Sequence, residues 1–274
     1  MIKRLMELGV MVDPEAAKLL EGGDADRITA KITKLNPMPF TINAELARKL
    51  LSEPAQPKLL RKIQPMAGMS VPDFSAAYGE RYSTLQRLLL KNPALANAVS
   101  VTSASGECSI IGMVKNKGTA IEDPSGEGAF SSDAKLLDGD VIGAVGTAAG
   151  GIFRAREIVF PGVQLKERAV SSGTLKAGGC ADCQIRTDAT GVYSVNGLTV
   201  AVSHTKLAKE ETLELLKRRH LTVPPKDWLE PQPDMLIANS AENFTENYKG
   251  VTVIGIKEGS TAEVDLNTRE TVFK

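Results

Sequence analysis

The sequence predicts a multidomain α+β protein, and three observations lead to that class. Apolar residues recur at helical spacing through the first fifty positions and again from residue 72 to 92. Short extended segments separated by glycines begin at Cys108. Beyond Pro161, strand and helix signals are mixed. We therefore expect four parts: a helical N-terminal module (1–52), a Pro-rich basic linker (53–71), a helix plus small barrel (72–163) and an α+β domain (164–274).

The N-terminal module is expected to contain three short helices. The run Asp13-Pro14-Glu15 supplies an N-cap, a first-turn proline and a first-turn acid, and Gly22-Gly23 ends that helix. A second helix fits residues 24–35. A third fits residues 43–51, with Asn43 as its cap.

The next segment, from Ser52 to Val71, is expected to be a linker. It contains Pro54, Pro57 and Pro65, and the stretch 48–62 has five basic residues against one acid. Such a linker would let the N-terminal module move semi-independently. An amphipathic helix then opens at Pro72 and ends at Asn92-Pro93. Its apolar stripe is expected to face a core and comprises Phe74, Tyr78, Tyr82, Leu85, Leu88 and Leu89.

The strands after Cys108 suggest a small closed barrel. Four segments carry the signal: 108–114, 118–123, 140–146 and 152–160. Four or five strands in about fifty residues fit a five-stranded oligonucleotide-binding (OB) barrel, with a fragment of a sandwich as the alternative. Further on, residues 193–202 form a hairpin around Asn196-Gly197, a helix fits 209–220, and 248–254 and 261–266 are strands.

Composition excludes several classes of protein. The chain has 274 residues with 33 basic and 33 acidic side chains, so it is not a basic packaging protein. No apolar run approaches the roughly 20 residues of a membrane-spanning helix, and no signal peptide is expected. Three cysteines argue against a disulfide framework and favour a reducing, cytoplasmic compartment. No Walker loop or GxGxxG motif occurs.

Few residues point to metal chemistry. Cys180 and Cys183 form one CxxC without a second ligand pair, so we expect incidental cysteines in a loop, with zinc as the lesser alternative. His204 follows a strand of small apolar residues, where metallohydrolases place ligands, but one histidine cannot hold a catalytic metal. His220 ends the run Lys217-Arg218-Arg219, which most simply suits a helix C-terminus and less readily a phosphate.

Several segments together resemble one protein family. The helix 74–90, the barrel segments Leu137-Asp-Gly-Asp-Val-Ile-Gly and Ala155-Arg-Glu-Ile-Val-Phe-Pro-Gly-Val, and the tail segments Leu215-Leu-Lys-Arg-Arg-His-Leu and Tyr248-Lys-Gly-Val-Thr-Val-Ile are similar to the small subunit of the archaeal family D DNA polymerase. The N-terminal Leu8-Gly-Val-Met-Val-Asp-Pro-Glu-Ala resembles that family's N-terminal domain. The resemblance extends over nearly the whole chain.

The resemblance implies an OB barrel and a calcineurin-like phosphodiesterase domain that holds two divalent metals and acts as a 3′ to 5′ exonuclease. Here the domain is shortened. The position of its Asp-x-His motif corresponds to Val170-Ser-Ser-Gly-Thr-Leu, which has no carboxylate or imidazole. Its Gly-Asp and Gly-Asn-His motifs are missing, and its Gly-His-x-His is replaced near Ile237-Ala-Asn-Ser-Ala-Glu-Asn. Only His204 matches a family ligand. We expect no catalytic residues, no metal and no cofactor, and a non-catalytic accessory subunit of a replicative DNA polymerase that binds the large catalytic subunit and DNA.

Two other functions remain open from the sequence, beside a decayed product that folds poorly. One is a free-standing single-stranded DNA-binding barrel, for which Lys115, Lys117, Arg154 and Arg156 are the candidate contacts; the few aromatics, Phe130, Phe153 and Phe160, weigh against it. The other is a residual metal-dependent phosphodiesterase around His204, Asp188, Asp234 and Glu242.

Overall fold

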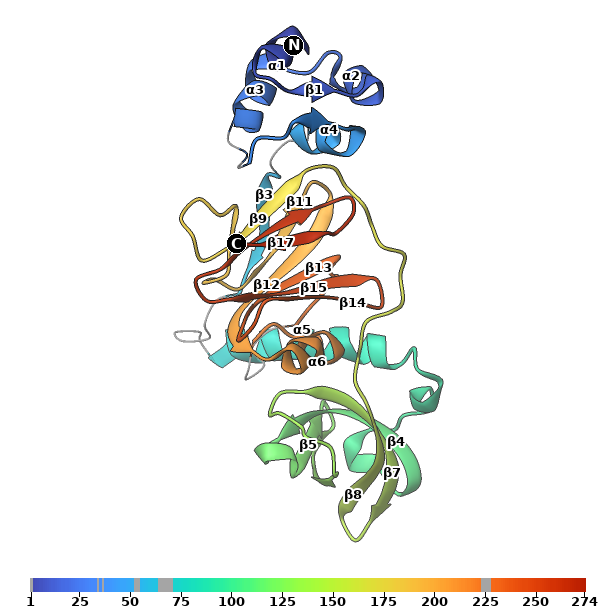
Figure 1. The fold of residues 1–274 in the computed structure, drawn as a ribbon. Helices are drawn as coiled ribbons and strands as arrows, with labels where there is room; N and C mark the ends of the chain where they lie inside the picture. The colour runs from blue at the N-terminus through green and yellow to red at the C-terminus, as the bar shows by residue number, and fades with distance from the viewer. Residues whose placement is uncertain (1, 34, 36, 52–54, 64–70, 223–227) are drawn as a thin grey trace.

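The structure is a computed structural model that describes residues 2–33, 35, 37–51, 55–63, 71–222 and 228–274. It is a mixed α+β protein of several bodies, as the sequence predicts (Figure 1). A small helical module, a two-sheet sandwich and a closed barrel follow one another along the long axis of the molecule, and helices α5 and α6 lie between the sandwich and the barrel.

The N-terminal module repeats one pattern twice, a helix followed by a short strand and a second helix. It comprises α1 (Ile2–Glu7), β1 (Met11–Val12), α2 (Pro14–Leu20), α3 (Ala25–Thr33), β2 (Thr41–Ile42) and α4 (Ala44–Leu51). The two strands pair in parallel, and each leads into a helix. Asn43 caps α4 by accepting a hydrogen bond from the Leu46 amide (2.9 Å), whereas the Asp13 side chain makes no cap bond at α2. Leu5, Leu20 and Ile32 lie in its own apolar core.

Part of the expected linker is a strand. Residues 57–62 form β3 (Pro57–Lys62), which pairs with β11 (Gly191–Val195) of the sandwich, 130 residues later in the sequence. Pro57 stands at the first strand position, where a missing amide is tolerated. The prediction failed because prolines and lysines suit an edge strand as well as a linker. Pro54 and Pro65 lie outside the described residues.

Helix α5 (Val71–Leu89) packs one face on the barrel. Tyr82, Leu85 and Leu89 of the expected stripe are buried there, against Ile111 and Val141. Tyr78 and Leu88 pack partly against the same cluster, and the side chain of Phe74 lies outside the described residues. A short turn of 3₁₀ helix, η1 (Pro93–Leu95), follows, and Asn92 caps it by accepting from the Ala94 amide (3.0 Å).

The barrel is closed by five strands in the order β4-β5-β6-β8-β7. Their bounds are β4 (Gly106–Lys115), β5 (Ala120–Asp123), β6 (Gly126–Ser131), β7 (Val141–Ala149) and β8 (Ile152–Val159), with 3₁₀ turns η2 (Val101–Ser103) and η3 (Asn116–Gly118). Strand β6 is not among the four expected segments, since Gly126 and Gly128 resemble a turn. Strands β6 and β8 pair in parallel and complete the ring. Gly146 is required at the β7 bulge, because a Cβ there would lie 2.0 Å from the Arg154 carbonyl oxygen.

The C-terminal part is a sandwich of a six-stranded and a four-stranded sheet, ordered β14-β15-β13-β12-β11-β3 and β10-β9-β16-β17. The bounds are β9 (Thr174–Gly178), β10 (Ile185–Arg186), β12 (Leu198–Leu207), α6 (Lys209–Arg218), β13 (Met235–Ser240), β14 (Phe244–Tyr248), β15 (Val251–Lys257), β16 (Thr261–Asp265) and β17 (Thr271–Phe273). The expected β11–β12 hairpin turns at Asn196 (φ 49°) and Gly197 (φ 85°).

Strands β12, β13 and β15 run parallel, and α6 connects the first two. One apolar core fills the space between the two sheets and includes Leu175, Ile237 and Val264. A second joins α6 to the outer face of the larger sheet through Leu216 and Val253. Within the described residues, no helix has the length and apolar character that crossing a membrane requires.

Candidate functional site

The carboxyl ends of the parallel strands β12, β13 and β15 lie together at one end of the larger sheet, which we call the strand-end edge. The only predicted family ligand, His204, lies there. The imidazole is exposed, and its Nδ1 lies 2.5 Å from the Thr190 hydroxyl oxygen. Asn239 on β13 donates from Nδ2 to the carbonyl oxygens of Thr187 and His204 (3.0 Å each). The polar groups at this edge therefore bond to one another and tie neighbouring strand ends together.

A cavity of about 310 Å³ opens beside these strand ends. The Lys206 ammonium lies 3.2 Å from a Glu258 carboxylate oxygen across it, and Arg186 donates two hydrogen bonds to Asp188. The Arg186 guanidinium lowers the pKa of Asp188 below its usual value. The cavity is lined by Gly179, Thr187, Asp188, Lys206, Asn239, Ser240, Lys257, Glu258 and Gly259. Its two carboxylates each already have a cationic partner.

The four residues considered for a residual metal site do not converge. Asp234 precedes β13, accepts a hydrogen bond from the Thr199 amide (2.7 Å) and pairs with Lys166 (2.6 Å). Thr199 is the second residue of β12 and His204 lies five positions further, so Asp234 sits at the opposite end of the sheet, roughly 16 Å of strand away. Among the described residues, the one group of three or more metal-capable side chains is Cys180, Asp182 and Cys183.

The prediction that the CxxC cysteines are incidental is wrong. Cys180 and Cys183 form a disulfide that closes the turn between β9 and β10. The intervening Asp182 carboxylate accepts a hydrogen bond from Lys176, which lowers the pKa of Asp182. The odd cysteine count does not exclude this pairing, because Cys108, a free thiol on β4, takes no part in the turn.

Of the four basic barrel residues singled out for DNA, two form ion pairs with acids, one contacts a backbone carbonyl and one is exposed. Lys115 pairs with Glu122 (2.5 Å) and Glu127 (3.7 Å), and Glu122 raises the pKa of Lys115. Arg156 pairs with Glu107 (3.2 Å), and Arg154 reaches the Ala149 carbonyl oxygen (3.5 Å).

Lys117 is exposed in η3, where its φ is 56°. The barrel aromatics are also unsuited to stacking on bases, since Phe130 and Phe153 stack on each other in the barrel interior with ring centres 6.1 Å apart. Both rings are buried. Phe130 and Phe153 are therefore not available to stack on the bases of a single strand.

The joint between the barrel and the sandwich holds a buried ion pair, Arg218 with Asp140. We call Asp140, Phe160, Arg218 and His220 the joint cluster. Arg218, the last residue of α6, donates to the Asp140 carboxylate of the barrel and to the Lys135 carbonyl oxygen (2.7 Å), and its guanidinium lies 4.6 Å above the Phe160 ring. His220 is fully buried, with Nε2 3.4 Å from Asp140 Oδ1.

The neighbouring Arg219 also serves the joint. It takes the left-handed conformation (φ 59°) that ends α6 and donates to the carbonyl oxygens of Gly162 and Leu229. Burial lowers the pKa of Arg219. Arg218, Arg219 and His220 are all buried, so the phosphate contact considered for this run is not supported by their placement. Pattern reasoning missed the joint because Asp140 and Arg218 are 78 residues apart in sequence.

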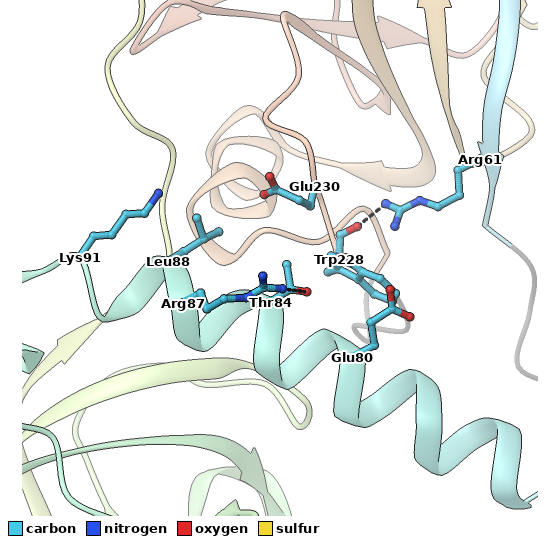
Figure 2. Close-up of a pocket in the computed structure, with 8 residues that line it drawn as sticks. All are labelled: Arg61, Glu80, Thr84, Arg87, Leu88, Lys91, Trp228 and Glu230. Carbon is cyan, nitrogen blue, oxygen red and sulfur yellow. Dashed lines mark hydrogen bonds between the residues drawn. The ribbon is translucent and has the colours of Figure 1, made fainter.

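A groove of about 540 Å³ lies on the other side of α5 (Figure 2). Glu80 and Arg87 of α5 and Lys91, just after it, line one wall, and Trp228 and Glu230 line the other. Arg61 extends from β3, donates to the Trp228 carbonyl oxygen and lies 5.0 Å from the Trp228 ring centre. The lining contains both cations and acids, so the groove does not select one sign of ligand charge.

No protein-family model matches the chain, and no curated protein sequence matches it.

Proposed function

We propose that this chain is a non-catalytic small subunit of a replicative DNA polymerase of the family D type. The observation that carries the proposal is the order of its parts: a helical module, a closed five-stranded barrel and a two-sheet sandwich whose parallel strand ends lack a metal-ligand set among the described residues. The resemblance described above implies the same order of parts, with a phosphodiesterase site at those strand ends.

The barrel fits an OB fold. It is closed, has five strands, and is completed by the parallel pairing of its third and fifth strands. Two of its four candidate DNA contacts, Lys115 and Arg156, are paired with acids, and its stacked phenylalanines are buried. These features favour a barrel that serves protein assembly over one that tracks single-stranded DNA.

The sandwich fits a shortened phosphodiesterase domain. Parallel strands joined by a helix crossover end at one edge, where metallohydrolases place their ligands. At that edge His204 bonds to Thr190, and Asn239 donates to two backbone carbonyls. Two metals at the close spacing of a hydrolytic site need several carboxylates and imidazoles together, so we expect no exonuclease activity.

The joint cluster is expected to hold the barrel and the sandwich in a fixed relative orientation for docking on a large subunit. Because Arg218 binds both Asp140 and a barrel carbonyl in a buried setting, the barrel and the sandwich are expected to present one continuous surface to a large subunit. An assembly subunit needs such a fixed relative orientation more than it needs a catalytic centre.

The deciding experiment is co-expression with the family D polymerase large subunit of the same source, followed by affinity capture and size-exclusion chromatography at low and high salt. We expect a stable 1:1 complex. Exonuclease assays with manganese should give no activity above that of a His204→Ala variant carried through the same purification. Clean separation of the two chains at low salt would overturn the proposal, and salt-dependent binding of oligonucleotides by the isolated chain would favour a DNA-binding barrel instead.

A further inference from the structure

The six-stranded sheet has an open edge at β3. This strand pairs with β11 on one side, through five residue partners with a register shift between Val192 and Tyr193, and it is the last strand in the sheet order of the described residues. In an antiparallel pair, alternate residues direct their N–H and C=O groups away from the partner strand. Strand β3 therefore presents a row of backbone donors and acceptors that another strand could meet.

The same strand exposes apolar surface. Leu59 and Leu60 are 48% and 53% exposed and stand next to each other at the middle of β3. A single exposed leucine is ordinary, but two adjacent leucines on an unpaired strand edge offer contacts to the side chains of an added strand.

The charge of the edge selects its partner. Residues 54–72 contain Lys58, Arg61 and Lys62 and no acid. Arg61 turns inward to Trp228, as Figure 2 shows, whereas Lys58 and Lys62 are exposed and have no ion pair recorded with any described residue. Two β3 edges from different copies would bring lysines together, which opposes pairing between them. An acidic strand would instead be attracted.

We propose that β3 is a docking edge for an extended, acidic peptide segment of a partner protein, which adds a seventh strand to the sheet. Backbone hydrogen bonds to β3 supply the pairing, Leu59 and Leu60 contact apolar side chains of the segment, and Lys58 and Lys62, which lie on opposite faces of the strand, attract its carboxylates. Nucleic acid would satisfy the lysines but neither the leucines nor the strand's amides. The inference stands on the edge itself and does not depend on the polymerase assignment.

The probe is a fluorescein-labelled peptide, Glu-Val-Asp-Val-Glu-Val-Asp, titrated with the full-length protein and followed by fluorescence anisotropy. We expect saturable binding, together with slower amide hydrogen exchange in residues 57–62. Lys58→Glu/Lys62→Glu should weaken binding at least tenfold. Lys3→Glu/Lys18→Glu makes the same charge change at two exposed lysines of the N-terminal module and should stay within twofold of the unchanged protein.

Two further peptides separate strand pairing from charge attraction: one N-methylated at every valine and one at every acid. Strand addition requires that at least one of them lose binding, because one set of amides must donate to β3. If both N-methylated peptides bound as well as the unmodified peptide, the proposal would be overturned. It would also be overturned if the unmodified peptide did not bind, or if slower exchange were confined to residues outside 57–62. If a single-stranded oligonucleotide displaced the labelled peptide as well as the unlabelled peptide does, and slowed amide exchange in the same residues, the edge would be a nucleic-acid surface. Self-association without peptide, protecting both β3 and β14, would assign the edge to a second copy.

Discussion

The joint cluster and the carboxyl ends of β12, β13 and β15 both contain ion pairs, but those at the joint are buried and those at the strand ends are exposed. At the joint, Asp140 and Arg218 are buried and come from different bodies of the molecule. At the strand ends, the pairs Arg186–Asp188 and Lys206–Glu258 are exposed, and the first joins residues only two positions apart.

This difference indicates which of the two regions contributes more to the stability of the fold. A buried ion pair is costly to disturb because removing one partner leaves the other charge without solvent or counter-ion. An exposed pair contributes little, since water and salt replace it readily. We therefore expect the stability of the molecule to depend far more on the barrel–sandwich joint than on the carboxyl ends of β12, β13 and β15.

The largest expected effect is at the joint. Arg218→Ala leaves the Asp140 carboxylate buried without its cation and should lower the free energy of unfolding by about 3–5 kcal/mol. Urea denaturation followed by circular dichroism measures this change. The matched control is Lys217→Ala, which removes the neighbouring and more exposed partner of Glu214 and should cost less than about 1 kcal/mol. Equal effects of the two substitutions would remove the distinction between the regions.

An intermediate effect is expected at the strand ends. Asn239→Ala removes two hydrogen bonds to the carbonyls of Thr187 and His204, and we expect a loss of about 1–2 kcal/mol in the free energy of unfolding. His204→Ala is the comparison, since its exposed ring bonds only to Thr190 among the described residues. A loss with His204→Ala that exceeds the loss with Asn239→Ala, and that divalent metal reverses, would restore a metal role for this edge.

Local patterns predicted many of the elements, though not β3 or β6, and they did not predict the long-range partners. The Asn196-Gly197 turn, the Asn43 cap and the helix spacing of Tyr82, Leu85 and Leu89 are each encoded within a few residues, and the structure contains all three. By contrast, β3 becomes a strand only because β11, far along the chain, pairs with it. The approach of Arg218 to Asp140 likewise depends on how two bodies pack, which no local period reports.

The strand-end site was predicted in part for a similar reason. The position of His204 near the end of a strand follows from the apolar run before it, and the structure places it on β12. Whether Asp188, Asp234 and Glu242 surround it depends on strand direction in a mixed sheet. Asp234 precedes a strand that runs parallel to β12, and this alone moves it to the far end.

A third prediction concerns the contact of α5 with the barrel, which adjoins the joint. Tyr82 donates to the Ile111 carbonyl oxygen (3.1 Å), and burial raises its pKa from 10.0 to about 12, with a smaller contribution from Asp123. Because the folded pKa lies above the ordinary value, this stabilisation is complete below pH 10 and is lost as the pH rises through about 12. Tyr82→Phe should cost about 1 kcal/mol at neutral pH and flatten that alkaline decline.

The measurement is urea denaturation at a series of alkaline pH values, together with the ultraviolet absorbance of tyrosinate. Tyr248→Phe serves as the control, because Tyr248 lies on β14 away from the barrel. An alkaline decline that is equally steep with and without Tyr82 would show that the α5 contact does not hold the phenol in its neutral form.

The smallest expected effect is at Asp188, which lines the cavity beside the strand ends. The test is whether the neighbouring Arg186 alone lowers the pKa of this carboxylate. Arg186 lowers the pKa of Asp188, so the stabilisation from this pair is present above the ordinary aspartate pKa of about 3.9 and is lost as the pH falls through the lowered value. Arg186→Gln should return the pKa of Asp188 to its ordinary range with little change in stability at neutral pH, since both side chains are more than half exposed. Carboxyl-carbon NMR titration of the two proteins measures the shift. If the pKa of Asp188 stayed low without Arg186, another positive group would have to face this carboxylate, and the cavity would be better organised for ligands than its exposed ion pairs indicate.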